Sequence, residues 1–285
     1  MGQPRARGHR TWVVLAVVFL ILAVSSVVTA QISSGAAGLT VARLEWGDRP
    51  VERRAEGEDS WQRLQVGDRL RTGDRLRTSS DGVARLDFPW MAVTLGPSSV
   101  LSIPASKVLS TVLEKGRAEF SGPGRDIVKI RVGQGEIRGG GRLVLWHEGE
   151  RTAAAALGGA FRVSGAGKTV VIQAGAGTSL KGAQPPRVAM PLPEAPDGLV
   201  PGGDPAYVRS GNPAELYWTP RGGEHHVEVL ALEGDDVLLA RNASTPPVRI
   251  EIPWLGTFRW RVSARDERGL ESAPSSAGYV CVVDR

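Results

Sequence analysis

The chain has 285 residues, including 36 glycines and 19 prolines, so we expect two folded units rich in short strands and turns. Three of its 35 basic residues, Arg5, Arg7 and Arg10, precede the first apolar stretch, and the remainder carries 32 basic against 30 acidic residues. So small and dispersed a surplus lacks the clustered basic face that nucleic-acid binding requires, and we expect no nucleic-acid partner.

A long apolar segment follows these arginines. No Asp, Glu, Lys or Arg occurs from Thr11 to Ala42, and a helix needs about 17 to 25 apolar residues to cross a bilayer. The arginines should stay in the cytoplasm, which predicts a single-pass inner-membrane protein with its C-terminal region in the periplasm. The residues expected in the membrane are Trp12, Val13, Val14, Leu15, Val18, Phe19, Leu20, Ile21, Leu22, Val24, Val27 and Val28.

A cleaved signal peptide is the alternative interpretation of this segment. Val28-Thr29-Ala30 offers small residues where a signal peptidase cuts, and the mature chain would then begin at Gln31. We favour the uncleaved anchor, because the apolar stretch reaches spanning length whereas a signal peptide needs only about 7 to 15 apolar residues. Both interpretations export the rest of the chain.

The exported chain shows the period-two alternation of strands with one buried face. Ala84, Leu86 and Phe88 alternate with polar residues, and Met91, Val93 and Leu95 follow the same pattern. Similar short apolar pieces continue to about residue 173, separated by glycine-rich turns. The pattern predicts an all-β fold, a roll or sandwich, with no βαβ units.

Residues 67–72 and 73–78 both read Gly-Asp-Arg-Leu-Arg-Thr. Two successive turn-and-strand units explain this repeat, with Leu70 and Leu76 in the core and the arginines in solvent. An anion-binding cluster of the arginines is the alternative.

Several blocks between residues 40 and 185 resemble the FecR domain family. They are Gly-Asp-Arg-Leu at 67–70, Thr-Gly-Asp-Arg-Leu-Arg-Thr at 72–78, Ala-Arg-Leu-Asp-Phe at 84–88 and Leu-Gly-Pro-Ser-Ser-Val-Leu at 95–101. Later blocks at 112–118, 158–163 and 174–178 are also similar, whereas Pro-Trp-Met at 89–91 departs from the family's usual acidic-glycine turn.

This resemblance implies a role in envelope signalling. The best-known members join a cytoplasmic domain that grips a sigma factor to an external region that contacts an outer-membrane receptor. Only about ten residues precede the apolar segment here, too few for a folded domain, so we do not expect a complete anti-sigma regulator.

A proline-rich stretch separates a second module from the first. The prolines of residues 186–205 predict a stiff linker that no central strand could contain. Beyond it, residues 255–266, Leu-Gly-Thr-Phe-Arg-Trp-Arg-Val-Ser-Ala-Arg-Asp, resemble the penultimate-strand region of a fibronectin type III-like sandwich. We therefore expect a short cytoplasmic tail and anchor at 1–33, a FecR-like domain at 40–185, the linker at 186–205 and an immunoglobulin or fibronectin type III-like sandwich at 206–285, with Trp218 and Trp260 in its core.

No motif predicts catalysis, a cofactor or a metal. Gly165-Ala166-Gly167-Lys168-Thr169 lacks the earlier glycine and the following helix of a phosphate-binding loop. His225 and His226 are adjacent, so in a strand they point to opposite faces. The single cysteine, Cys281, is expected to pack as a small hydrophobe. We therefore expect a non-enzymatic protein.

Eight tryptophans are the most unusual feature of the composition. Large aromatic side chains at a surface commonly mark binding patches, although packing at module edges is the alternative. The five that lie near turns or strand ends are the candidate partner-binding residues: Trp46, Trp61, Trp90, Trp146 and Trp254.

These features predict a signalling or scaffold protein of the bacterial cell envelope that binds another envelope protein through its β modules. Its partner would be an outer-membrane receptor or a membrane protein that regulates a sigma factor. The alternative is a glycan-binding or peptidoglycan-binding protein, or an envelope polysaccharide hydrolase with an unrecognised carboxylate pair such as Glu148 and Glu150.

Overall fold

The computed structural model describes residues 40–47, 49–105, 110–123 and 128–284, and all regular structure in these ranges is β-strand. The fold is therefore all-β. Among these residues no helix has the length and apolar character needed to cross a bilayer. The predicted membrane segment, Trp12 to Val28, lies outside the described residues, and its helix stays a prediction.

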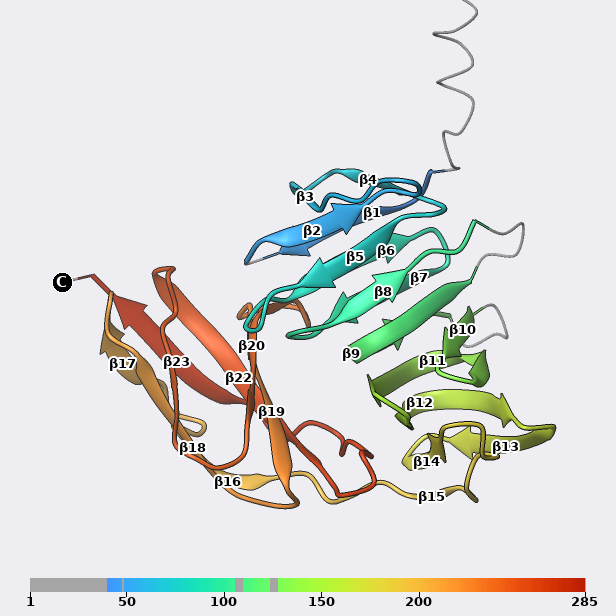
Figure 1. The fold of residues 1–285 in the computed structure, drawn as a ribbon. Helices are drawn as coiled ribbons and strands as arrows, with labels where there is room; N and C mark the ends of the chain where they lie inside the picture. Colours follow the sequence, from blue (N-terminus) through green and yellow to red (C-terminus); the bar gives the residue numbers. More distant parts are fainter. Residues whose placement is uncertain (1–39, 48, 106–109, 124–127, 285) are drawn as a thin grey trace, which may run out of the picture. The chain divides into compact units, whose positions relative to one another are not determined.

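Residues 40–285 form one compact unit that holds two β modules. Fifteen strands make up the first module, in the sheet order β15-β14-β12-β11-β10-β9-β7-β6-β1-β4 with β13, β2, β3, β5 and β8 attached beside this path (Figure 1). The strands are β1 (Thr40–Gly47), β2 (Val51–Arg54), β3 (Gln62–Arg63), β4 (Arg69–Arg71), β5 (Arg75–Thr78), β6 (Ala84–Phe88), β7 (Met91–Leu95), β8 (Val100–Ser102), β9 (Thr111–Ser121), β10 (Val128–Val132), β11 (Gly135–Glu148), β12 (Arg151–Gly165), β13 (Lys168–Gln173), β14 (Ala176–Lys181) and β15 (Met190–Pro191).

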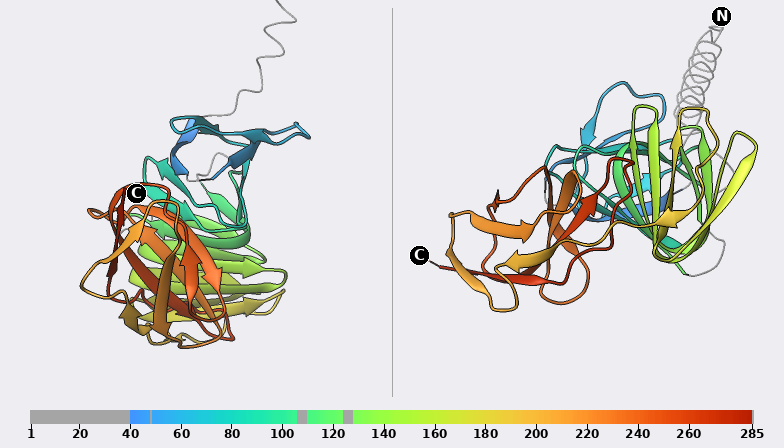
Figure 2. Two further views of the ribbon diagram at one scale, coloured as in Figure 1. Left: turned by 90° about the vertical axis from the view of Figure 1, so that its left-hand side faces the viewer. Right: turned by 90° about the horizontal axis from the view of Figure 1, so that it is seen from below.

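Three long strands, β9, β11 and β12, each change pairing partners along their length. In β9, residues 111–115 pair with β8 and β10, whereas residues 116–121 pair with β7 and β11. The strands β11 and β12 change partners midway in the same manner. Figure 2 shows the strands from β9 to β14 (green to yellow) lying side by side. The two halves of each long strand thus pair with different neighbouring strands.

Glycines sit where these strands bend. Gly116 has φ +90° and Gly159 has φ +77°, a region that L side chains rarely adopt. A Cβ on Gly159 would lie 2.0 Å from the carbonyl oxygen of Gly140, and one on Gly116 would lie 2.6 Å from the Cα of Ser99. No other residue fits these corners without moving the neighbouring strand.

The core of the first module confirms the predicted alternation. Ala84, Leu86 and Phe88 of β6 and Met91, Val93 and Leu95 of β7 are all buried, and the two strands form an antiparallel hairpin. Leu70 and Leu76 of the hexapeptide repeat are fully buried, as predicted. The turn of residues 166–167 joins β12 and β13 as an antiparallel hairpin, so a strand, not a helix, follows it.

The predicted linker, residues 186–205, contains two short strands. β15 pairs with β14 at the edge of the first module, and β16 (Asp197–Val200) pairs with β18 (Ala214–Thr219) at an edge of the second. Proline lacks the N–H that a central strand must donate, so a proline-rich segment can pair only at an edge. The segment is therefore tied to both modules.

The second module is a sandwich of two sheets. One has the order β16-β18-β21, where β21 is Val248–Ile250, and the other has the order β17-β23-β22-β19-β20 (Figure 1). The second sheet comprises β17 (Ala206–Arg209), β19 (Glu224–Leu230), β20 (Val237–Ala243), β22 (Gly256–Arg265) and β23 (Gly278–Val283). Trp218 and Trp260 are buried between the sheets, as predicted.

Two details of this module refine the expectations. The ring of His225 lies 5.2 Å from the ring of Trp218 (centroid to centroid), whereas His226 hydrogen-bonds to Asn242. The two adjacent histidines therefore contact different residues. Cys281 is only half-buried, because β23 directs Val280 and Val282 to the core and Cys281 to the other face. It is therefore not the core residue that the sequence predicted.

Candidate functional site

The two modules meet across a buried charged network centred on Arg117. This arginine lies on the outer face of β9 and is 5% exposed. Its Nε donates to Oε2 of Glu271 at 2.9 Å and its Nη2 donates to Oε1 at 2.8 Å, a two-pronged contact between modules. Ser263 of β22 donates a further hydrogen bond to Oε1 of Glu271 at 2.6 Å.

A second buried carboxylate, Glu228, belongs to the network. Glu228 of β19 is 4% exposed and lies 3.5 Å from Nη1 of Arg117. Nε of Arg261 donates to its other oxygen at 2.7 Å, and Nε2 of His226 lies 3.3 Å from the first. Each buried charge therefore faces a charge of opposite sign, which is what makes its burial tolerable.

The opposite charges in this network shift the pKa values of Arg117, Glu271 and Glu228 so that each group stays charged. Burial alone would lower the pKa of Arg117, but Glu271 and then Glu228 outweigh it and raise that pKa. Burial alone would raise the pKa of Glu271, but Arg117 outweighs it and lowers that pKa. Burial opposes the shift of Glu228 too, and His226, Arg117 and Arg261 hold its pKa well below the ordinary value. All three groups are thus charged at neutral pH.

A small apolar contact lies beside the network. Val83 of the first module packs with Leu230, Val237 and Ala240 of the second, and all four are buried. The junction therefore combines apolar packing with paired charges, and it joins the two modules into one body.

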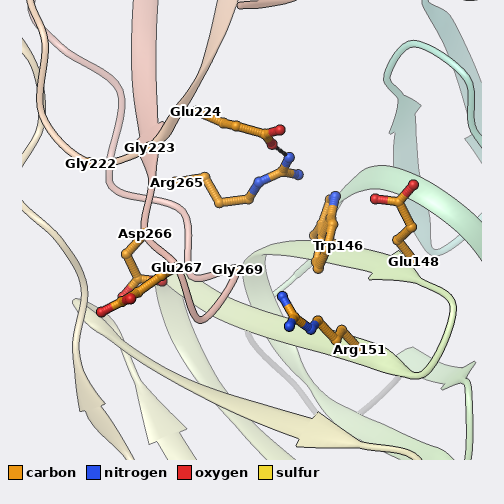
Figure 3. Close-up of a pocket in the computed structure, with 10 residues that line it drawn as sticks. All are labelled: Trp146, Glu148, Arg151, Gly222, Gly223, Glu224, Arg265, Asp266, Glu267 and Gly269. Atoms are coloured by element: carbon orange, nitrogen blue, oxygen red, sulfur yellow. Dashed lines mark ion pairs between the residues drawn. The ribbon is translucent and has the colours of Figure 1, made fainter. Parts of the chain in front are cut away.

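A pocket opens at the edge of this junction, with a volume of about 670 Å³. Three turns form it, one from each of the β11–β12, β18–β19 and post-β22 connections (Figure 3). The residues that line it are Trp146, Glu148, Arg151, Gly222, Gly223, Glu224, Arg265, Asp266, Glu267 and Gly269. The first three belong to the first module and the others to the second.

Trp146 is the aromatic group of this pocket. The guanidinium carbon of Arg265 lies 4.3 Å from the centroid of its ring, and Arg265 forms an ion pair with Glu224. Burial lowers the pKa of Arg265, and Glu271 and Glu148 oppose that effect. Figure 3 shows Trp146 standing between Arg265 on one side and Glu148 on the other. Trp146, one of the candidates whose side chain the structure describes, thus lines a pocket at the module junction.

Trp61, another candidate, is covered by arginines. The guanidinium carbon of Arg77 lies 4.3 Å from its ring centroid and that of Arg54 lies 5.4 Å away. Arg77 also pairs with Glu52, at 2.5 Å from its Nε. Because Arg77 of the hexapeptide repeat is already paired within its own module, the structure favours a solvated face over an anion-binding cluster.

Two further candidates pack at module edges. The ring of Trp90 lies 5.7 Å from that of Phe88, and the ring of Trp254 lies 6.3 Å from that of Phe258 (centroid to centroid). Both are partly buried against the cores. The side chain of Trp46, the fifth candidate, lies outside the described residues.

The expectation that the protein binds no metal and is not an enzyme stays a prediction. Among the described residues, no group of three or more His, Cys, Asp or Glu side chains is placed to hold a metal ion. His147 is buried, with Nδ1 2.8 Å from the hydroxyl of Thr152, and burial lowers its pKa.

The sequence did not reveal Arg117, Glu228 or Glu271. Arg117 and Glu271 are 154 residues apart; Arg117 alternates with Gly116 and Ala118 as a solvent-facing strand residue would, and Glu271 lies between β22 and β23. Only the contact between modules, which no local pattern encodes, buries them.

Comparisons with known proteins identify no family. No protein-family model matches this chain, and no curated protein matches it. Two crystal structures of a protein described as a candidate anti-sigma factor from Parabacteroides distasonis ATCC 8503 are similar to it. In each case the identity is 16%, the match covers 41% of this chain and 59% of that chain, and the TM-score is 0.36. The chain thus matches less than two thirds of that protein's length, and the FecR and fibronectin type III resemblances stay predictions.

Proposed function

We propose that this chain is a non-enzymatic scaffold or signalling protein of the cell envelope that binds another envelope protein through its two β modules. In this proposal the apolar segment of residues 12–28 anchors it in the inner membrane, and residues 40–285 face the periplasm. A FecR-type first module and a fibronectin type III-like second module are part of the same proposal.

The observation that carries the proposal is the junction pocket itself. Both modules contribute to it, and the buried contact between Arg117 and Glu271 holds them together beside it. A binding site formed by two modules binds its partner more tightly when the modules are already held in place, because ordering them during binding costs free energy. The network thus supports a preformed site that includes Trp146.

Affinity capture from envelopes tests this proposal. The tagged full-length chain, solubilised in detergent, serves as bait, and the pocket variant Glu148→Arg/Glu267→Arg serves as the comparison. Both positions are exposed at the pocket, so the variant should fold. Asp204→Arg, an exposed position of the second module outside the pocket, is the matched control.

We expect the wild-type chain and the Asp204 variant to recover the same envelope protein and the pocket variant to recover much less of it. Repeated recovery of no specific protein, or equal recovery by the pocket variant, would contradict the proposal.

The carboxylates beside Trp146 also suit a second candidate, an envelope polysaccharide hydrolase. Incubation of the chain with purified sacculi separates the two. We expect no soluble fragments, and their release by the wild type but not by Glu148→Gln would favour the enzyme.

A further inference from the structure

We infer that the junction pocket accepts a positively charged side chain, arginine or lysine, from a segment of the partner protein. This inference rests on the proposed binding function and specifies the chemistry of the partner at that site.

The charge of the pocket is the first argument. Four carboxylates line it, those of Glu148, Glu224, Asp266 and Glu267, against the two guanidiniums of Arg151 and Arg265. The chain as a whole carries a formal charge of +5, so this negative excess is a local property of the pocket. A concave site with one sign of charge concentrates the field and attracts ligands of the opposite sign.

The chain's own Arg265 is the second argument, since it shows how the pocket holds a cation. Its guanidinium lies over the ring of Trp146 and pairs with Glu224, while its side chain is only 15% exposed. The face of Trp146, the ion pair with Glu224 and the nearby carboxylates of Glu271 and Glu148 together keep this guanidinium largely out of water. A second cation entering from solvent meets the exposed carboxylates of Glu148 and Glu267 (Figure 3).

The packing of Trp146 argues against the other ligand classes. Arg265 covers its ring, and the backbone of Gly269 packs so closely that an added Cβ would lie 2.9 Å from Cε3 of the indole. A neutral sugar needs an open aromatic face on which to stack, and little of this one is left. An anionic ligand would have to approach four carboxylates. A cationic side chain needs no open ring face, because it can pair with the carboxylate rim.

Fluorescence polarisation with the full-length chain in detergent tests the inference. The probe is a fluorescein-labelled Gly-Arg-Gly-Arg-Gly peptide, and the same peptide with citrulline in place of arginine removes the charge but keeps the shape. Glu148→Gln/Glu267→Gln removes the rim carboxylates, and Asp204→Asn is the matched control.

We expect saturable binding of the arginine peptide that is at least about threefold weaker in the rim variant and unchanged in the control. We also expect the citrulline peptide to bind at least about threefold more weakly than the arginine peptide. Equal binding of the two peptides, equal binding by the rim variant, or no binding of the arginine peptide would each overturn the inference. Displacement of the bound peptide by chitosan oligosaccharides at lower concentration than by free peptide would assign the site to an amino sugar and also overturn it.

The outcome is separable from that of the proposed function. If affinity capture recovers a pocket-dependent partner while the arginine peptide fails to bind, the scaffold role stands and the cationic ligand is wrong. If the peptide binds at the pocket but no envelope partner is recovered, the proposed function fails instead.

Discussion

Replacement of Arg117 by methionine removes the central cation of the junction while keeping a side chain of similar length. Glu228 retains Arg261 at 2.7 Å, but the hydrogen bond from Ser263 is the side-chain hydrogen bond that Glu271 retains, beside the more distant charge of Arg265. The cost therefore falls mainly on Glu271, a 4% exposed carboxylate that loses its two-pronged ion pair. Loss of one partner of a buried ion pair costs about 3 to 5 kcal/mol, and we expect the free energy of unfolding to fall by that amount.

The double variant Arg117→Met/Glu271→Leu separates charge from packing. Apolar replacement of both partners of a buried pair is often nearly neutral, so the double variant should recover most of the stability that the single variant loses. Urea unfolding of residues 40–285, followed by tryptophan fluorescence, measures all three proteins. Arg249→Met is the matched control, because Arg249 and Glu215 form an exposed ion pair whose loss should leave the unfolding midpoint close to that of the wild type.

Two results would refute this reasoning. A loss below about 1 kcal/mol in the single variant would show that water or another group already compensates Glu271. A double variant no more stable than the single one would show that the cost comes from lost packing of the arginine side chain and not from an unpaired charge.

Three further predictions concern stability. The pKa values of Glu228 and Glu271 lie below the ordinary value of 4.5, so the stability that these carboxylates contribute is present above about pH 4.5 and is lost as the pH falls through their folded-state pKa values. Burial lowers the pKa values of His147 and His225, so protonation of these histidines in the unfolded chain begins to reduce stability below about pH 6.5. Urea midpoints between pH 7 and pH 3 should therefore fall towards acid, and a pH-independent midpoint would contradict this assignment. Gly159→Ala should cost about 2 kcal/mol or more, because the new Cβ meets the Gly140 carbonyl, whereas Gly167→Ala, at a positive φ with open space, should cost only about 1 kcal/mol; equal thermal shifts would show that the contact relaxes freely. Leu76→Ala should cost about 2 to 5 kcal/mol as a cavity in the first core, while Leu232→Ala, which is half-exposed, should leave the melting temperature near that of the wild type, and a small effect at Leu76 would place it outside the folding core.

The period-two pattern predicted the strands and their buried faces because a strand has only two faces. Leu70, Leu86 and Trp260 are therefore buried as expected. The pattern carries no information about which strand pairs with which. The change of partners within β9 and β11 depends on backbone bends, and the glycines at those bends looked like ordinary turn residues in the sequence.

The candidate site was only partly accessible to sequence reasoning. Trp146 was selected because it lies near a strand end, and it does line the pocket. Trp90 was selected on the same ground, yet it packs against Phe88, two residues away in the chain. Arg117 and Glu271 gave no signal at all, because their burial arises from contact between modules and not from the local sequence pattern around either residue.

Site-specific photo-crosslinking in the envelope of the host measures whether the junction pocket contacts another envelope protein. A photoreactive phenylalanine at Glu148, on the pocket rim, is compared with one at Asp204, and the full-length protein is recovered after irradiation. We expect one discrete adduct with another envelope protein from position 148 and none from position 204. No adduct at position 148, or the same adduct from both positions, would contradict the proposed function.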